Sequence, residues 1–96
     1  MILHYSADAV EDLRRLRSCI ASKNPDSARR IGRELSERLE SLPHFPRVGR
    51  PVSQAPDPET IRDFVFGDYV VRYSLHEATI VVLRIWHHFE ERPEQP

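Results

Sequence analysis

Two amphipathic segments that meet at Asn24-Pro25 constrain this chain more than any other feature of its sequence. Asparagine is a good helix N-cap and proline is pre-shaped for the first helical position, so a helix is predicted to begin at Pro25 and to end at Pro43. Its apolar stripe consists of Ala28, Ile31, Leu35, Leu39 and Leu42. Before the junction, apolar residues recur at helical spacing after Ser6, another capping residue. A tight link between two such helices predicts a helix hairpin.

The sequence after residue 60 changes to the pattern of strands. Residues 61–66 (IRDFVF), 69–75 (YVVRYSL) and 79–89 (TIVVLRIWHHF) are rich in β-branched and aromatic side chains. Short turns separate these three segments, which predicts an antiparallel meander. A short apolar run at residues 2–5 predicts one more strand, ahead of the helices.

The expected element order is therefore β-α-α-β-β-β. The two helices cannot bury both apolar stripes on each other, so one face of the sheet must cover them. The predicted class is α+β with two layers, a helix hairpin packed on an antiparallel sheet. Residues 1–92 are expected to form a single domain and residues 93–96 a frayed C-terminal tail. Residues 43–60, which hold five of the eight prolines, are expected to form a long loop.

The composition excludes several classes of protein. No run of about 18 apolar residues exists, so no membrane span is expected. Cys19 is the single cysteine, which fits the reducing cytoplasm and predicts a half-buried helix residue rather than a nucleophile. The net charge is −1, and Lys23 is the only lysine beside thirteen arginines, so overall charge does not indicate nucleic-acid binding.

The candidate functional face depends on the arginines of the meander. Arg62, Arg72 and Arg84 stand one on each of its three strands, and alternation places Trp86 and His88 on the same face as Arg84. The helices are expected to cover the opposite face, which carries Tyr69, Val71, Tyr73, Leu75, Leu83 and Ile85. If the register allows it, the arginines then cluster on the open side of the sheet.

Such a cluster has two interpretations. Three arginines beside a histidine and a tryptophan suit a polyanion or an acidic segment of a partner. Alternatively, the arginines are solvated residues of the open face, paired with acids such as Asp63, Glu77 or Glu90.

His87-His88 also permits more than one reading. A histidine can act as a general acid or base near neutral pH, or it can be a strand residue with a structural hydrogen bond. No further ligand stands at metal-binding spacing, so no metal is expected. No phosphate-binding glycine loop or other cofactor motif occurs, so no cofactor is expected.

Five short motifs together resemble the RelE/ParE toxin superfamily, and most closely its ParE-like branch of plasmid stabilisation toxins. They are A-x-x-DL-x-x-L at 9–16, NP-x-x-A-x-x-I at 24–31, L-x-x-x-P-x-x-GRP at 42–51, IR-x-x-x-x-x-DYVVRY at 61–73 and LRIWH at 83–87. Each motif is weak alone, but their order and spacing match over about residues 2–92.

The resemblance implies the toxin of a type II toxin–antitoxin system, held inactive in a hetero-oligomer with its antitoxin. ParE-like toxins poison DNA gyrase without known hydrolytic chemistry, whereas RelE-like toxins cut messenger RNA on the ribosome. A degenerate toxin that only binds its antitoxin is a third possibility. RelE-like toxins have a strongly basic active face, and this chain departs from that pattern. Gyrase inhibition without enzymatic activity is therefore the main expectation, and the endoribonuclease is the alternative.

The resemblance also assigns candidate residues. Arg62 and Arg84 with His87 or His88 would be the catalytic residues if the chain were a ribonuclease. The residues expected to bind a target or a partner are Arg50, Arg62, Arg72, Arg84 and Trp86. The antitoxin is expected to dock on apolar grooves beside the helix hairpin and on the arginine face.

Overall fold

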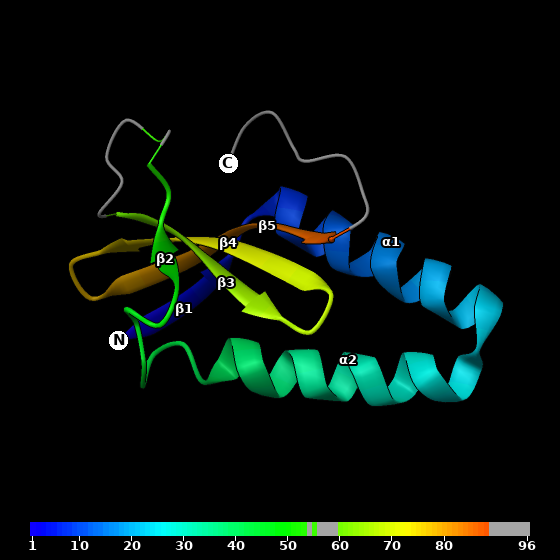
Figure 1. Ribbon diagram of the computed structural model, residues 1–96. Helices are drawn as coiled ribbons and strands as arrows, with labels where there is room; N and C mark the ends of the chain where they lie inside the picture. Colours follow the sequence, from blue (N-terminus) through cyan, green and yellow to red (C-terminus); the bar gives the residue numbers. More distant parts are fainter. Residues whose placement is uncertain (54, 56–59, 89–96) are drawn as a thin grey trace.

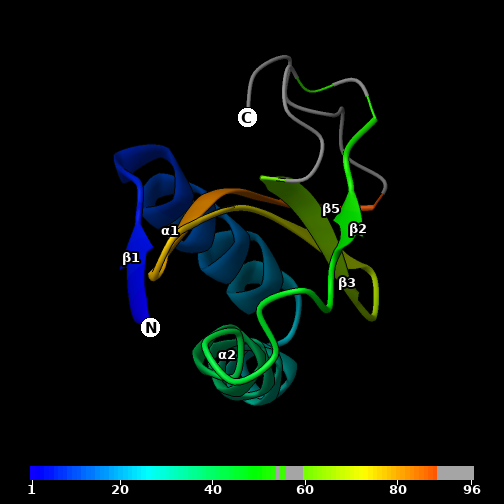
Figure 2. The same cartoon turned by 90° about the vertical axis from the view of Figure 1, so that its left-hand side faces the viewer.

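A computed structural model describes residues 1–53, 55 and 60–88 of the chain (Figure 1). The elements follow the order β1 (Ile2–Tyr5), α1 (Ala7–Lys23), α2 (Pro25–Glu40), β2 (Arg50–Pro51), β3 (Ile61–Phe66), β4 (Tyr69–His76) and β5 (Thr79–His87). The predicted α+β class with two layers is confirmed, because both helices pack on one face of a single sheet (Figure 2). The expected C-terminal tail at 93–96 lies outside the described residues.

The two helices begin where the sequence predicts. Ser6 caps α1, its side-chain oxygen accepting a hydrogen bond from the Ala9 amide at 3.0 Å. Asn24 caps α2 in the same way through the Ser27 amide at 3.1 Å, and Pro25 occupies the first helical turn. The Asn24 amide also donates to the Ile20 carbonyl and so ends α1. One residue thus closes the first helix and opens the second.

The sheet differs from the prediction at both edges. Its strand order is β1-β5-β4-β3-β2, and β1 pairs with β5 in parallel, so the sheet is mixed rather than wholly antiparallel. The other edge strand, β2, lies inside the segment predicted to be a loop. It is only two residues long and contains Pro51, which a sheet tolerates at an edge where no neighbour needs the missing N–H. A pattern based on alternation does not detect so short a strand.

A β-bulge in β5 corrects the predicted core. Arg72 lies opposite Arg84, but the next residue, Tyr73, lies opposite Val82, so Leu83 is left without a direct partner. The extra residue resets the alternation of inward and outward side chains. Val82 is consequently fully buried, whereas Leu83, predicted to face the helices, is only partly buried.

The loop between α2 and β2 is tied to the core by Tyr73. The Tyr73 hydroxyl donates to the Pro46 carbonyl at 2.8 Å and accepts from the Gly49 amide at 2.9 Å. Burial raises the pKa of the Tyr73 phenol, although the Gly49 hydrogen bond and the Arg62 charge oppose this shift. The hydroxyl therefore keeps the proton that it donates to Pro46.

A close backbone approach at the same place explains Gly49. A Cβ atom there would lie 2.9 Å from the Tyr73 ring and hydroxyl and 2.9 Å from the Asp63 carbonyl. Both neighbours are buried or part of the sheet and cannot move aside cheaply. Only glycine fits without displacing the loop or the strand.

We predict that Gly49→Ala lowers the free energy of unfolding by about 1–3 kcal/mol, because it overpacks a closed contact. The matched control is Gly32→Ala in α2, where an added Cβ meets nothing within 4 Å. This control should raise the free energy of unfolding by about 0.5–1 kcal/mol, since alanine favours the helix. Urea unfolding of both variants checks the pair, and equal effects of the two would contradict the steric argument.

Candidate functional site

A row of charged residues crosses the open face of the sheet. Arg50 of β2 lies opposite Asp63 of β3, Asp63 lies opposite Arg72 of β4, and Arg72 lies opposite Arg84 of β5. Directly opposed residues point to the same face, so all four side chains share the face that the helices leave open. Trp86 joins them, because it lies two residues beyond Arg84 on β5.

Arg72 is held by an acid and an aromatic ring. Its Nε and Nη2 atoms donate to the two carboxylate oxygens of Asp63 at 2.8 and 2.9 Å. Its guanidinium carbon lies 5.2 Å from the centre of the Trp86 ring, a cation–π distance. Arg72 thus pairs with Asp63, one of the acids considered from the sequence, but it is buried at 6% exposure and not solvated as that interpretation expected.

Arg84 is held by an acid from the other layer. Its Nε donates to Asp12 Oδ2 at 2.8 Å, and its Nη2 donates to Asp12 Oδ1 at 3.2 Å. The same carboxylate accepts from the Ile85 amide at 2.9 Å and from Arg15 at 3.3 Å. Burial alone would raise the pKa of Asp12, but the hydrogen bonds from Arg84 and Ile85 outweigh it and leave that pKa lowered. The same pair raises the pKa of Arg84.

These contacts also protect an edge of β5. Strand β1 ends at Tyr5, opposite Val82, so β5 has no strand neighbour on that side further along. Ser6 continues the pairing: its amide donates to the Val82 carbonyl at 2.9 Å and its hydroxyl to the Leu83 carbonyl at 2.8 Å. Asp12 and Arg15 of α1 then bind the amide and the carbonyl of Ile85. Side chains of α1 thus satisfy backbone groups that would otherwise form an open edge.

Arg62 does not belong to this row, which corrects the predicted cluster of three arginines. It lies opposite Tyr73, so it points to the face that the helices cover. The side chain is buried, and its Nη1 donates to the Gly49 carbonyl at 2.8 Å and to the Arg47 carbonyl at 3.5 Å. The register between β3 and β4 decides this, and the sequence alone left that register open.

The two histidines are also separated. His87 lies opposite Tyr69 on the face toward the helices, and the two rings meet edge to face with centres 5.2 Å apart. His88 follows β5, where its amide donates to the Asp68 carbonyl and its side chain is exposed. The four residues proposed for a ribonuclease site, Arg62, Arg84, His87 and His88, are thus spread over both faces of the sheet.

Arg50 is the most exposed charge of the row. Its side chain is exposed, and within the described residues it makes no hydrogen bond or ion pair. Four of the five residues predicted to bind a target or partner (Arg50, Arg72, Arg84 and Trp86) therefore share one face. Two of these arginines already have an acid partner.

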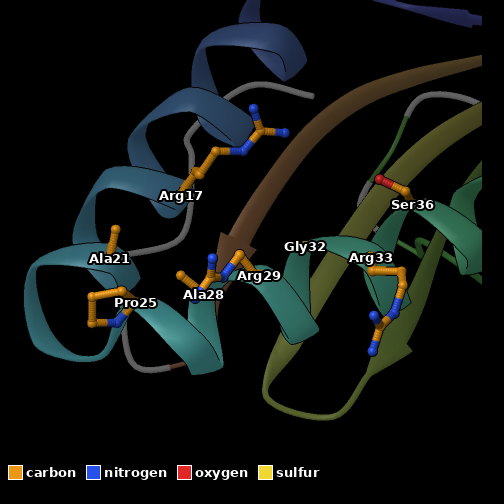
Figure 3. A pocket seen from close by; sticks show the side chains of 8 residues that line it. All are labelled: Arg17, Ala21, Pro25, Ala28, Arg29, Gly32, Arg33 and Ser36. Atoms are coloured by element: carbon orange, nitrogen blue, oxygen red, sulfur yellow. The ribbon is translucent and has the colours of Figure 1, made fainter.

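Two grooves border the helix hairpin. The first, of about 550 Å³, lies between the helices (Figure 3) and is lined by Arg17, Ala21, Pro25, Ala28, Arg29, Gly32, Arg33 and Ser36. Its floor is made of small residues and its polar rim carries three arginines. The second, of about 480 Å³, is lined by residues of both helices and by Asp68, Tyr69 and His87. Grooves beside the hairpin were expected from the sequence.

The sequence interpretation missed Asp12. It is buried on the inner face of α1 together with Ala9 and Leu16, three residues before it and four after it. A carboxylate on an apolar helical stripe is unusual, because a buried charge requires a partner. The position of Asp12 between Ala9 and Leu16 was therefore the signal in the sequence that this acid has a basic partner elsewhere in the chain.

Other classes of site are not found in the part of the chain that the structure describes. No group of three or more histidine, cysteine or acidic side chains there could hold a metal ion. Within the same residues, no helix is long and apolar enough to cross a membrane.

We predict that Asp12→Asn lowers the free energy of unfolding near neutral pH by about 1–3 kcal/mol, because it weakens the charged hydrogen bonds to Arg84. The folded-state pKa of Asp12 is lowered, so its contribution is present above the pKa of an unfolded aspartate, about 3.9, and is lost as the pH falls further. In urea unfolding, the free energy of unfolding of Asp12→Asn should therefore be lower than that of the parent at neutral pH, and the two values should converge in acid.

The exposed Asp26, which pairs with Arg29, provides the control for this experiment. Asp26→Asn should change the unfolding midpoint far less than Asp12→Asn does. The difference in the free energy of unfolding between Asp12→Asn and the parent could also stay constant down to pH values well below the ordinary pKa of aspartate. The buried ion pair would then not be the cause of that difference.

Comparison with known proteins identifies the family. The model of the family described as ParE toxin of type II toxin-antitoxin system, parDE, matches residues 3–92. Toxin RelE1 of Caulobacter vibrioides is 36% identical over 87 residues, which cover 91% of this chain and 92% of that protein. The solved chromosomal ParDE TA system from P. aeruginosa contains a chain of the same fold, with a TM-score of 0.76, 21% identity and coverage of 91% of this chain and 95% of that one. This chain therefore belongs to the ParE toxin family of type II toxin–antitoxin systems.

Proposed function

We propose that this toxin inhibits DNA gyrase by binding to it, without hydrolytic chemistry of its own, and that a cognate antitoxin neutralises it. The observation that supports this most is the pairing of its sheet arginines with carboxylates. Asp63 binds Arg72 and Asp12 binds Arg84. An arginine that already has an acid partner offers little charge to the phosphates of a messenger RNA.

The placement of the histidines supports the same reading. Cleavage of RNA needs an acid or base within hydrogen-bond reach of the reacting atoms and a cation beside them. His87 and Arg62 lie on the helix side of the sheet, whereas Arg84 lies on the open side. The net charge of −1 with a single lysine also argues against a surface built for RNA.

The groove between the helices suits the antitoxin. Its small-residue floor can accept the apolar side of a helix, and Arg17 and Arg33 at its rim can bind acidic side chains. An acidic amphipathic helix of the antitoxin is the segment with this chemistry. Its binding would form a toxin–antitoxin hetero-oligomer.

We predict that induced expression of the chain alone in a bacterium arrests growth and induces the DNA-damage response while protein synthesis continues. The purified chain should also inhibit supercoiling by purified gyrase. Pulse labelling of new protein and a supercoiling gel measure the two effects. Immediate loss of translation with cleaved transcripts, and intact supercoiling, would favour the ribosome-dependent endoribonuclease instead.

We further predict that His88→Ala leaves growth arrest unchanged. The His88 side chain is exposed, and gyrase binding assigns it no catalytic role. Growth curves at matched expression levels measure the effect, with the parent chain as reference. Under the endoribonuclease alternative with His88 as the acid or base, the same substitution would abolish the arrest, so a lost arrest would contradict the gyrase proposal.

A further inference from the structure

The loop between α2 and β2 contains a turn with an ordered backbone. The Val48 amide donates to the Phe45 carbonyl at 3.1 Å, which closes a four-residue turn with Pro46 at its second position. Proline fixes the backbone angle that this position requires. The turn follows directly on the tight bend at the end of α2, where the Phe45 amide donates to the carbonyls of Ser41 and Leu42.

Two buried polar side chains hold this turn from below. Tyr73 binds the Pro46 carbonyl and the Gly49 amide, and Arg62 binds the carbonyls of Gly49 and Arg47. Tyr73 has no exposed surface, and Arg62 is 6% exposed. Burying an arginine and a tyrosine hydroxyl is costly unless their hydrogen bonds are made, and here those bonds fix the backbone of one surface turn.

The side chains that this turn carries point to solvent. Phe45 is 65% exposed and Val48 is 51% exposed, and Arg47 between them is exposed as well. We call these three residues the turn surface. Residues 44–50 include no acid, and Arg50 at their end is also exposed, so the positive charge here has no acidic neighbour along the chain.

These features are those of a preformed contact site. Aromatic residues and arginine supply most of the binding energy in protein interfaces. A backbone fixed before binding loses little conformational entropy when the partner docks, so affinity improves. Single exposed apolar residues are common, but here two of them stand three residues apart on one fixed turn beside an exposed arginine, a combination that suits a protein contact.

We propose that the turn surface is where the toxin contacts its target, by inserting Phe45 and Val48 into an apolar pocket that carboxylates border. The inference rests on the proposed function, since it takes gyrase to be the protein that supplies the pocket. Projecting side chains fit a pocket on a folded partner, whereas the grooves of the hairpin fit a segment of the antitoxin. The exposed arginines Arg47 and Arg50 would meet the carboxylates at the border.

The test compares inhibition of gyrase with binding of the antitoxin. The triple variant Phe45→Ala, Arg47→Ala, Val48→Ala changes only exposed side chains, so it should fold. We expect it to need roughly tenfold or more protein for the same inhibition of supercoiling, because it removes an aromatic and an arginine anchor. Its co-purification with the co-expressed antitoxin should be unchanged. The matched control is Val65→Ala with Arg30→Ala, exposed residues elsewhere on the surface, and it should inhibit like the parent.

A second variant tests the role of the buried clamp. Tyr73→Phe keeps the ring but removes the hydroxyl that holds Pro46 and Gly49, so the turn surface stays chemically intact and loses its fixed backbone. We expect weaker inhibition of gyrase than the parent shows, with cooperative thermal unfolding retained. Tyr5→Phe is the matched control, since no hydrogen bond of its hydroxyl holds the turn, and it should inhibit normally.

The outcomes are distinct. If the triple variant inhibits gyrase as well as the parent does, the turn surface is not the target contact, while the proposed function stands. Loss of antitoxin binding by that variant overturns the choice of partner, because the antitoxin then occupies this surface. If the parent chain does not inhibit gyrase at all, the proposed function fails. Growth arrest then tests the turn surface. If the triple variant no longer arrests growth, the turn surface is supported as the target contact. If it still arrests growth, the turn surface is not the target contact.

Discussion

Above a shared apolar core, one buried carboxylate fixes how the two layers of this toxin align. The side chain of Asp12 in α1 binds both the Arg84 guanidinium and the Ile85 amide of β5. A shift of the helix along the strand would therefore break charged hydrogen bonds of a buried group. The apolar contacts around it are not directional and would tolerate sliding. A buried charge with several partners tolerates very little, because each lost partner leaves a desolvated group. The groove that the helices form with Tyr69 and His87 therefore depends on where this contact holds the hairpin.

Toward the other edge of the sheet, at β3 and β2, buried polar side chains again form hydrogen bonds that fix a neighbouring segment. There the buried groups are Arg62 and Tyr73, and they hold the backbone of a loop rather than a helix. All three arginines of the meander strands thus serve the architecture: Arg62 holds a loop, Arg72 binds an acid on the neighbouring strand and Arg84 binds an acid on α1. Arginines of an ordinary enzyme site would be kept available for substrate. Arg47, Arg50 and two arginines of the hairpin groove, Arg17 and Arg33, are exposed and lie at places suited to protein partners.

Much of the fold could be predicted from the sequence, because it depends on local patterns. The cap at Asn24-Pro25, the stripes of the two helices and the three strands of the meander were read directly from residue types. The parallel pairing of β1 could not be read, since nothing local in residues 2–5 indicates which strand they join. The bulge at Leu83 also escaped, because alternation assumes that no residue is left over between strands. The face that Arg62 takes followed from the register, which only the packed sheet determines.

The candidate site was predictable in part for the same reason. Arg72, Arg84 and Trp86 share a face because two of them lie on one strand and the third pairs across, as alternation implies. Their acid partners were harder to find. Asp63 was among the acids considered, but Asp12 belongs to another layer and lies 72 residues from Arg84. Sequence patterns describe single elements well, whereas a contact between elements is fixed only when they pack.

The pairing of β1 with β5 has a consequence for how the toxin comes into being. The hydroxyl of Ser6 binds the Leu83 carbonyl, a separation of 77 residues, and among the described residues β1 pairs with no strand besides β5. The first strand can therefore pair only after residues 79–82 have been synthesised, and Asp12 of α1 can bind its partner only after Arg84 has been synthesised. Contacts that close such long loops form late. The N-terminal strand and helix thus depend for their place in the fold on the last strand that the structure describes.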